Sequence, residues 1–107
     1  MLEKILKSLF GKVPVTEKSV KEASGTLKET LRNKGFTRVN QLSDAAVSAI
    51  VAEALHKASA QERDGVARIG VFCTQIDWAA DNVIAAFSGD AGADQRIKGV
   101  LTFHNLL

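Results

Sequence analysis

The side chains in this chain that could carry out catalysis are few. Asp77 and Asp81 are four residues apart, so a helix would present both carboxylates on one face, where such a pair can bind a cation or exchange a proton. More commonly, such a pair of carboxylates is solvated and forms an ion pair with a neighbouring cation, here Arg68 or Lys98. Cys73 has no histidine or basic residue at helical spacing to lower its thiol pKa, which favours a buried structural role.

Signatures of metal and phosphate binding are also lacking in the sequence. His56 and His104 are far apart, and no cluster of His, Cys, Asp and Glu has the spacing of a metal site. The Gly-Asp-Ala-Gly loop at residues 89–92 lacks the Lys-Ser/Thr pair of a P-loop and the ligand spacing of an EF-hand. We therefore expect no catalytic residue, no metal site, no cofactor and no enzymatic activity.

The binding of an anion by one helix face is a second kind of chemistry that the sequence offers. Four cations share a stripe with a glycine between them: Lys18, Lys21, Lys28 and Arg32, around Gly25. Such a stripe can hold a nucleotide, a nucleic acid or an acidic membrane surface. Glutamates at three- and four-residue spacings indicate an ordinary solvated face equally well, and no aromatic residues alternate with the cations to stack bases. Anion binding is therefore the alternative function.

The composition is that of one globular domain, residues 1–107. The net charge of +2 hides an asymmetry: residues 1–34 have eight Lys and Arg against four Glu, a net +4, and the remainder has a net −2. A basic first third can orient an anionic partner or favour head-to-tail contact between copies. The single cysteine excludes an intrachain disulfide, and no signal peptide or membrane-spanning run is apparent, so a cytoplasmic protein is expected.

A long apolar stripe indicates that these side chains are positioned by helices. Apolar residues recur at steps of three and four: Val66, Ile69, Cys73, Ile76, Ala80, Val83 and Phe87. This is the period of one helix face, and it predicts a central helix that ends near Ser88 and Gly89.

Further helical segments surround this one. Thr16 and Gly35 are predicted to bound a helix with inner residues Val20, Ser24, Leu27 and Leu31. Ser43 caps the next helix, with inner residues Val47, Ile50, Val51, Ala54, Leu55 and Ala58. A final segment has Ile97, Leu101 and His104 on one side. The prediction is an all-α compact bundle of four to five helices, with residues 1–13 as an amphipathic N-terminal helix and residues 16–107 as the helical core.

An α+β fold is the alternative. Asp64 and Gly65 form a turn signal, and the residues after them include Val71, Phe72 and Thr74, which suit strands. The small sheet would be built from residues 36–40, 66–74 and 99–104.

Binding of a protein partner is the function that the sequence favours. Val71 and Trp78 lie seven residues apart outside the main stripe, and Phe72 flanks it, so these residues either form the centre of an interface or are covered by other helices. Apolar residues of the N-terminal segment, Leu2, Leu9 and Phe10, would cover the core, another chain or, less often, a membrane surface. We expect a small non-enzymatic adaptor, inhibitor or self-associating regulatory protein, with a homo-oligomer as one form.

Overall fold

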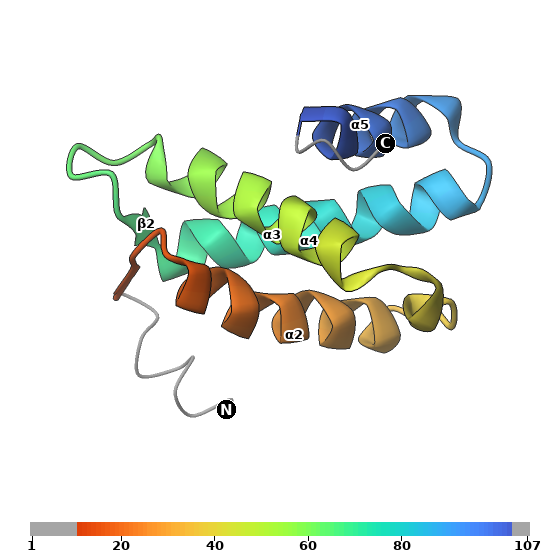
Figure 1. Ribbon diagram of the computed structural model, residues 1–107, viewed down its shortest axis with the longest axis horizontal. Helices are drawn as coiled ribbons and strands as arrows, with labels where there is room; N and C mark the ends of the chain where they lie inside the picture. The colour runs from red at the N-terminus through yellow and green to blue at the C-terminus, as the bar shows by residue number, and fades with distance from the viewer. Residues whose placement is uncertain (1–10, 104–107) are drawn as a thin grey trace.

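Four α-helices make up most of the chain that the structure describes (Figure 1). The computed structural model describes residues 11–103, and the side chains of residues 11–100. The helices are α2 (Glu17–Asn33), α3 (Asp44–Ser59), α4 (Ile69–Phe87) and α5 (Ala91–Phe103). A 3₁₀ helix, η1 (Val39–Gln41), and two short strands, β1 (Lys12–Val13) and β2 (Ala67–Arg68), complete the described chain. The predicted all-α bundle is confirmed.

Local capping signals explain where α2 and α3 begin. The Thr16 hydroxyl oxygen accepts a hydrogen bond from the Ser19 backbone N–H at 3.1 Å, and the Ser43 hydroxyl oxygen accepts one from the Ala46 N–H at 3.1 Å. These side chains satisfy backbone donors that a helix start otherwise leaves unpaired. Both predicted N-caps are confirmed.

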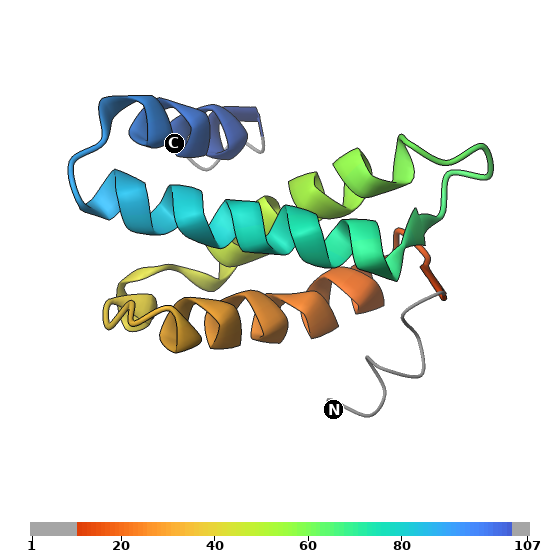
Figure 2. The ribbon, with the colours of Figure 1, turned by 180° about the vertical axis from the view of Figure 1, so that it is seen from behind.

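Helix α3 is the central element of the bundle. Its predicted inner residues are all buried: Val47, Ile50, Val51, Ala54, Leu55 and Ala58. It packs against α2, α4 and α5, while α2 and α5 lie on opposite sides of the α3–α4 pair (Figures 1 and 2). An alanine-rich helix suits this position, because small side chains let neighbouring helices approach closely.

The inner face of α2 differs slightly from the prediction. Leu27 and Leu31 are fully buried, as expected, whereas Val20 and Ser24 are only half-buried. Ala23 takes the inner place that was predicted for Ser24. The hydroxyl of Ser24 instead donates to the Val20 carbonyl oxygen at 2.8 Å, a local bond that a half-buried serine can make on the side of the helix.

Helix α4 begins later than the apolar stripe predicts. Its buried residues are Phe72, Ile76, Ala80 and Val83, while Cys73 is exposed and Phe87 is 38% exposed. The chain turns at Gly65, where φ is +69°, and then forms β2, so Val66 lies outside any helix. Phe72 and Cys73 flank the stripe of Ile76, Ala80 and Val83 on its two sides, and Phe72 is the one that is buried.

The alternative small sheet does not form. Residues 39–41 are a 3₁₀ helix and residues 99–103 are helical. Only β2 comes from the predicted strands, and its antiparallel partner is β1, with Lys12 opposite Arg68.

The same strand pairing corrects the predicted N-terminal helix. Lys12 and Val13 form β1, so a helix cannot extend to residue 13. The rest of that prediction, with Leu2, Leu9 and Phe10, lies outside the described residues, as does His104. Within the described chain, no helix is both long and apolar enough to cross a bilayer.

Replacement by alanine is expected to change the stability of the fold in opposite directions at two glycines. Neither Gly35 nor Gly25 has an atom within 4 Å of where a Cβ would lie, so only the backbone conformation distinguishes them. Gly35 has φ +85° at the end of α2, and Gly35→Ala is expected to destabilise the fold by about 1–2 kcal/mol. Gly25 is inside α2, and Gly25→Ala is expected to stabilise the fold by about 1 kcal/mol.

Urea denaturation followed by circular dichroism measures both effects. Changes of the same sign in the two variants would contradict the assigned helix end.

Candidate functional site

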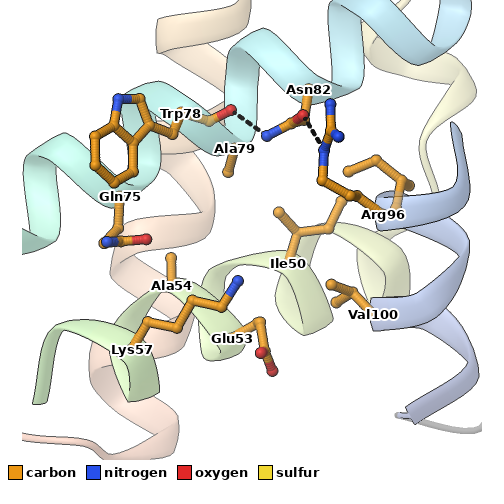
Figure 3. A pocket seen from close by; sticks show the side chains of 11 residues that line it. Ile50, Glu53, Ala54, Lys57, Gln75, Trp78, Ala79, Asn82, Arg96 and Val100 are labelled. Carbon is orange, nitrogen blue, oxygen red and sulfur yellow. Dashed lines mark hydrogen bonds between the residues drawn. The ribbon is translucent and has the colours of Figure 1, made fainter. Parts of the chain in front are cut away.

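A groove between α3, α4 and α5 is the principal candidate site (Figure 3). Its volume is about 220 Å³. Its lining residues are Ile50, Glu53, Ala54 and Lys57 of α3, Gln75, Trp78, Ala79 and Asn82 of α4, and Arg96, Ile97 and Val100 of α5. We call this the Trp78 groove.

Trp78 is the most exposed large apolar side chain of the described chain, at 57%. Of the two roles that the sequence left open for this residue, core and surface, the structure shows the surface. Its backbone carbonyl oxygen accepts a hydrogen bond from Nδ2 of Asn82 at 3.0 Å. Oδ1 of Asn82 in turn accepts from Nε of Arg96 at 2.8 Å, so this bond joins α4 to α5 along the groove (Figure 3).

The floor of the groove is apolar and its rim is polar. Ile50 and Ala54 of α3 are buried beneath it, and Ala79 of α4 is half-buried. Glu53 and Lys57 stand on the α3 side of the rim (Figure 3). An apolar centre with a polar border is the usual arrangement of a protein interface.

The other two interface residues predicted on α4 are placed differently. Phe72 is only 7% exposed and belongs to the core, so it is not available to a partner. Val71 is half-buried and packs against the same core. Of the three residues, Trp78 alone is exposed.

The contribution of α5 to the groove was missed from the sequence. Ile97 was assigned to an inner face, but Arg96 and Val100 were not recognised as part of a site. No local signal could have identified them, because the groove exists only where α5 packs back on α3 and α4.

The predicted basic face of α2 is only partly available to an anion. Lys18, Lys21 and Arg32 are exposed and form no ion pair with any residue in the described chain. Lys28 is instead half-buried, and its Nζ lies 3.0 Å from Oδ1 of Asp44 at the start of α3. Three unpaired cations therefore remain of the four predicted.

The two carboxylates considered for catalysis are bridged by one lysine. Nζ of Lys34, at the end of α2, lies 2.9 Å from Oδ1 of Asp77 and 3.0 Å from Oδ1 of Asp81. These hydrogen bonds raise the pKa of Lys34 above its ordinary value. The contacts of Lys34 with Asp77 and Asp81 therefore join the end of α2 to α4.

Arg68 and Lys98, which were predicted to form ion pairs with these carboxylates, have other partners. Arg68 pairs with Glu62, and Lys98 pairs with Asp94 within α5. Lys34 was missed because the end of α2 reaches α4 only in the folded chain.

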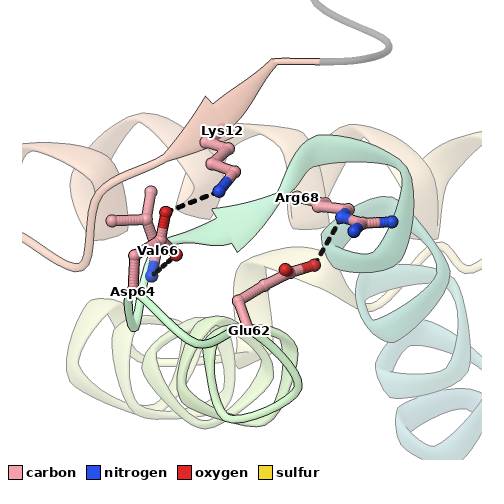
Figure 4. A network of polar contacts seen from close by, with 5 residues as sticks. All are labelled: Lys12, Glu62, Asp64, Val66 and Arg68. Atoms are coloured by element: carbon pink, nitrogen blue, oxygen red, sulfur yellow. Dashed lines mark hydrogen bonds and ion pairs between the residues drawn. The ribbon is translucent and has the colours of Figure 1, made fainter.

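A second polar network holds β1 against the connection between α3 and α4 (Figure 4). Nζ of Lys12 donates to Oδ2 of Asp64, whose other oxygen accepts from the Val66 N–H at 3.1 Å. The hydrogen bond from Lys12 is the main cause of a lowered pKa at Asp64. Arg68 and Glu62 pair beside it. This network lies where β2 interrupts the predicted helical stripe.

Other reactive groups do not form a site. No group of three His, Cys, Asp or Glu side chains in residues 11–100 could hold a metal ion. Cys73 is exposed, and partial desolvation raises the pKa of its thiol, which is the opposite of activation.

Phe87 forms a second exposed aromatic surface. Its ring meets that of Phe36 edge-on, with centroids 5.2 Å apart. The guanidinium of Arg38 lies 6.0 Å from the Phe87 centroid, at the limit of a cation–π contact. Because Phe36 and Arg38 lie near the Phe87 ring, and because the residue is only 38% exposed, this surface is less open to a partner than Trp78.

Comparison with protein-family models, with curated proteins and with solved structures finds no match for this chain.

Because Lys34 forms ion pairs, the free energy of unfolding is expected to change with pH in the alkaline range. Because the native-state pKa is raised, their stabilisation is complete below the unfolded-state value of 10.5 and is lost as the pH rises through the native-state pKa. We expect Lys34→Met to destabilise the chain at pH 8, with a difference from the wild type that shrinks above pH 10.5.

Lys98→Met is the matched control, since it removes an ion pair within a single helix. Urea denaturation between pH 8 and pH 12 measures the difference. A gap between wild type and Lys34→Met that stays constant over this range would contradict the bridge.

Proposed function

We propose that this chain is a small protein-binding module that takes up part of a partner in the Trp78 groove. The observation that carries the proposal is the exposure of Trp78 at the edge of an apolar floor. Tryptophan is enriched among the residues that dominate binding energy, because it buries a large area with little loss of side-chain freedom. The proposed activity needs no catalytic residue or cofactor.

The rim of the groove supports a specific contact. Lys57 and Gln75 can hydrogen-bond a partner from opposite sides of the groove. The bond from Arg96 to Asn82 holds the α5 wall in place beside them. Such a module would act as an adaptor or inhibitor, or by association with a second copy. We also propose the cytoplasmic location expected from the sequence.

Binding of an anionic ligand by α2 is the second candidate. The observation that favours it is the exposure of Lys18, Lys21 and Arg32 on one face without ion pairs among the described residues. Its occupant would be a nucleotide, a nucleic acid or an acidic membrane surface. Unlike groove binding, this binding would weaken steeply with added salt.

Two variants distinguish the proposals. Trp78→Ser removes the exposed indole, and Lys18→Glu/Lys21→Glu reverses two unpaired cations while leaving the groove intact. Loss of a central tryptophan contact costs about 2 kcal/mol or more, so we expect Trp78→Ser to weaken partner binding by about 30-fold or more. The double variant should bind like the wild type.

The measurement is affinity capture from the source cells with each immobilised chain, followed by titration calorimetry with the captured protein. Light scattering after size exclusion, at low and moderate salt, tests the same variants for self-association. A partner that Trp78→Ser retains and Lys18→Glu/Lys21→Glu loses would overturn groove binding in favour of the basic face.

A further inference from the structure

The walls of the Trp78 groove are helices, and this limits what can bind there. Its lining residues extend from Ile50 to Lys57 on α3 and from Gln75 to Asn82 on α4. Each of these walls therefore spans seven residues, or about 10 Å, which is close to two helical turns. Of the two described strands, neither contributes a lining residue.

A peptide in this groove must satisfy its own backbone hydrogen bonds. The N–H and C=O groups of a helical wall are bonded within that helix, so they cannot pair with an extended segment as the edge of a sheet does. A helix pairs its own backbone groups and presents apolar side chains at three- and four-residue spacing along one face. An amphipathic helix is therefore the form of peptide that suits the groove.

The floor of the groove has room for an aliphatic side chain. Ile50 and Ala54 are buried beneath it, and Trp78, at 57% exposed, offers the indole as a further apolar surface. An apolar cavity left by removal of one large aliphatic side chain is about 150 Å³. The groove, at about 220 Å³, takes at least one such side chain.

Two cations on different walls determine the charge of the groove. Lys57 of α3 and Arg96 of α5 are both exposed, and they form no ion pair with any residue in the described part of the chain. Glu53 is the one carboxylate among the lining residues, so the lining carries a net charge of +1. An acidic partner is therefore favoured over a basic one.

Arg96 has nitrogens available for a carboxylate. Its Nε donates to Oδ1 of Asn82 at 2.8 Å, which orients the guanidinium at the groove wall. No hydrogen bond to a described residue occupies its two terminal nitrogens. A guanidinium can bind a carboxylate through two of its N–H groups at once, so Arg96 suits an aspartate or a glutamate.

We propose that the Trp78 groove binds an amphipathic helix of a partner protein in which aspartate or glutamate borders the aliphatic face. The aliphatic side chains would lie on the floor and against the indole, and the carboxylates would pair with Lys57 and Arg96. This inference rests on the proposed function and names the chemistry of the partner.

Two model peptides test the charge preference with Trp78 as the reporter, because the chain has one tryptophan and no tyrosine. Each peptide is an alanine-based helix with two leucines one turn apart, bordered by glutamates in one peptide and by lysines in the other. Leucine against the indole should move the emission to shorter wavelength. The glutamate peptide is expected to bind about 10-fold more tightly at low salt, because it gains two exposed ion pairs where the lysine peptide is repelled. The difference should shrink at high salt.

Three variants locate the preference. Lys57→Glu/Arg96→Glu reverses both cations of the groove and should reverse the order of the two peptides. Lys18→Glu/Lys21→Glu changes the net charge of the chain by the same amount on α2 and should keep the wild-type order. Lys57→Glu alone retains the bond from Arg96 to Asn82 and should remove most of the preference. Circular dichroism checks that each variant keeps its helices.

Four results would overturn the inference. Equal binding of both peptides to the wild type would contradict an acidic partner. A preference that Lys18→Glu/Lys21→Glu loses and Lys57→Glu/Arg96→Glu keeps would assign it to α2. No emission shift with either peptide would contradict a helical occupant. A wild-type shift on dilution, with loss of dimer mass in light scattering, would assign the groove to a second copy.

The proposed function is tested separately, by the effect of Trp78→Ser on the captured partner. If that variant binds the partner as the wild type does, groove binding itself fails. If it loses the partner while the two peptides bind equally, only the acidic character of the partner fails.

Discussion

The burial of α3 is the constraint on which the rest of the structure depends. This helix packs against α2, α4 and α5, and its inner residues are almost wholly excluded from solvent. Helix α4 also packs against α2, α3 and α5, and it buries residues such as Ile76 and Val83. Trp78 follows Ile76 by two residues, which turns it to another side of α4, where it is 57% exposed. The groove that the indole lines has Ile50 and Ala54 of α3 in its apolar floor.

Polar contacts between distant parts of the chain join α4 and the turn before it to neighbouring elements. Lys34 joins the end of α2 to two carboxylates on α4. Before the start of α4, Lys12 and Asp64 hold β1 against the turn that precedes β2. These surface ion pairs are individually weak, because solvent screens them. The buried side of α4, with Ile76, Ala80 and Val83, therefore contributes most to its orientation.

Local signals in the sequence were sufficient for most of the helices. Thr16 and Ser43 are caps of the expected kind, and the six inner residues of α3 follow from spacing alone. The start of α4 was not predictable, because it depends on β1, which comes from a remote part of the chain. The stripe that included Cys73 had the correct period, but Phe72 is buried beside it in place of Cys73.

The candidate site was less accessible to sequence reasoning than the fold. The spacing of Val71 and Trp78 identified a face outside the core stripe, but only tertiary packing decides which residue on that face is covered. The α5 wall was not predictable at all, since Arg96 and Val100 acquire a role only when α5 folds back. The basic stripe on α2 was correct as a pattern, and only the pairing of Lys28 with Asp44 reduced it.

The proposed function requires that the chain bind its partner through the Trp78 groove. Site-specific photo-crosslinking tests it most directly, with a photoreactive residue placed at Gln75 on the groove rim or at Lys21 on the basic face, in the cells that express the chain natively. Groove binding predicts a discrete crosslinked species from Gln75 and none from Lys21. Crosslinks from Lys21 alone would contradict groove binding and identify α2 as the binding surface.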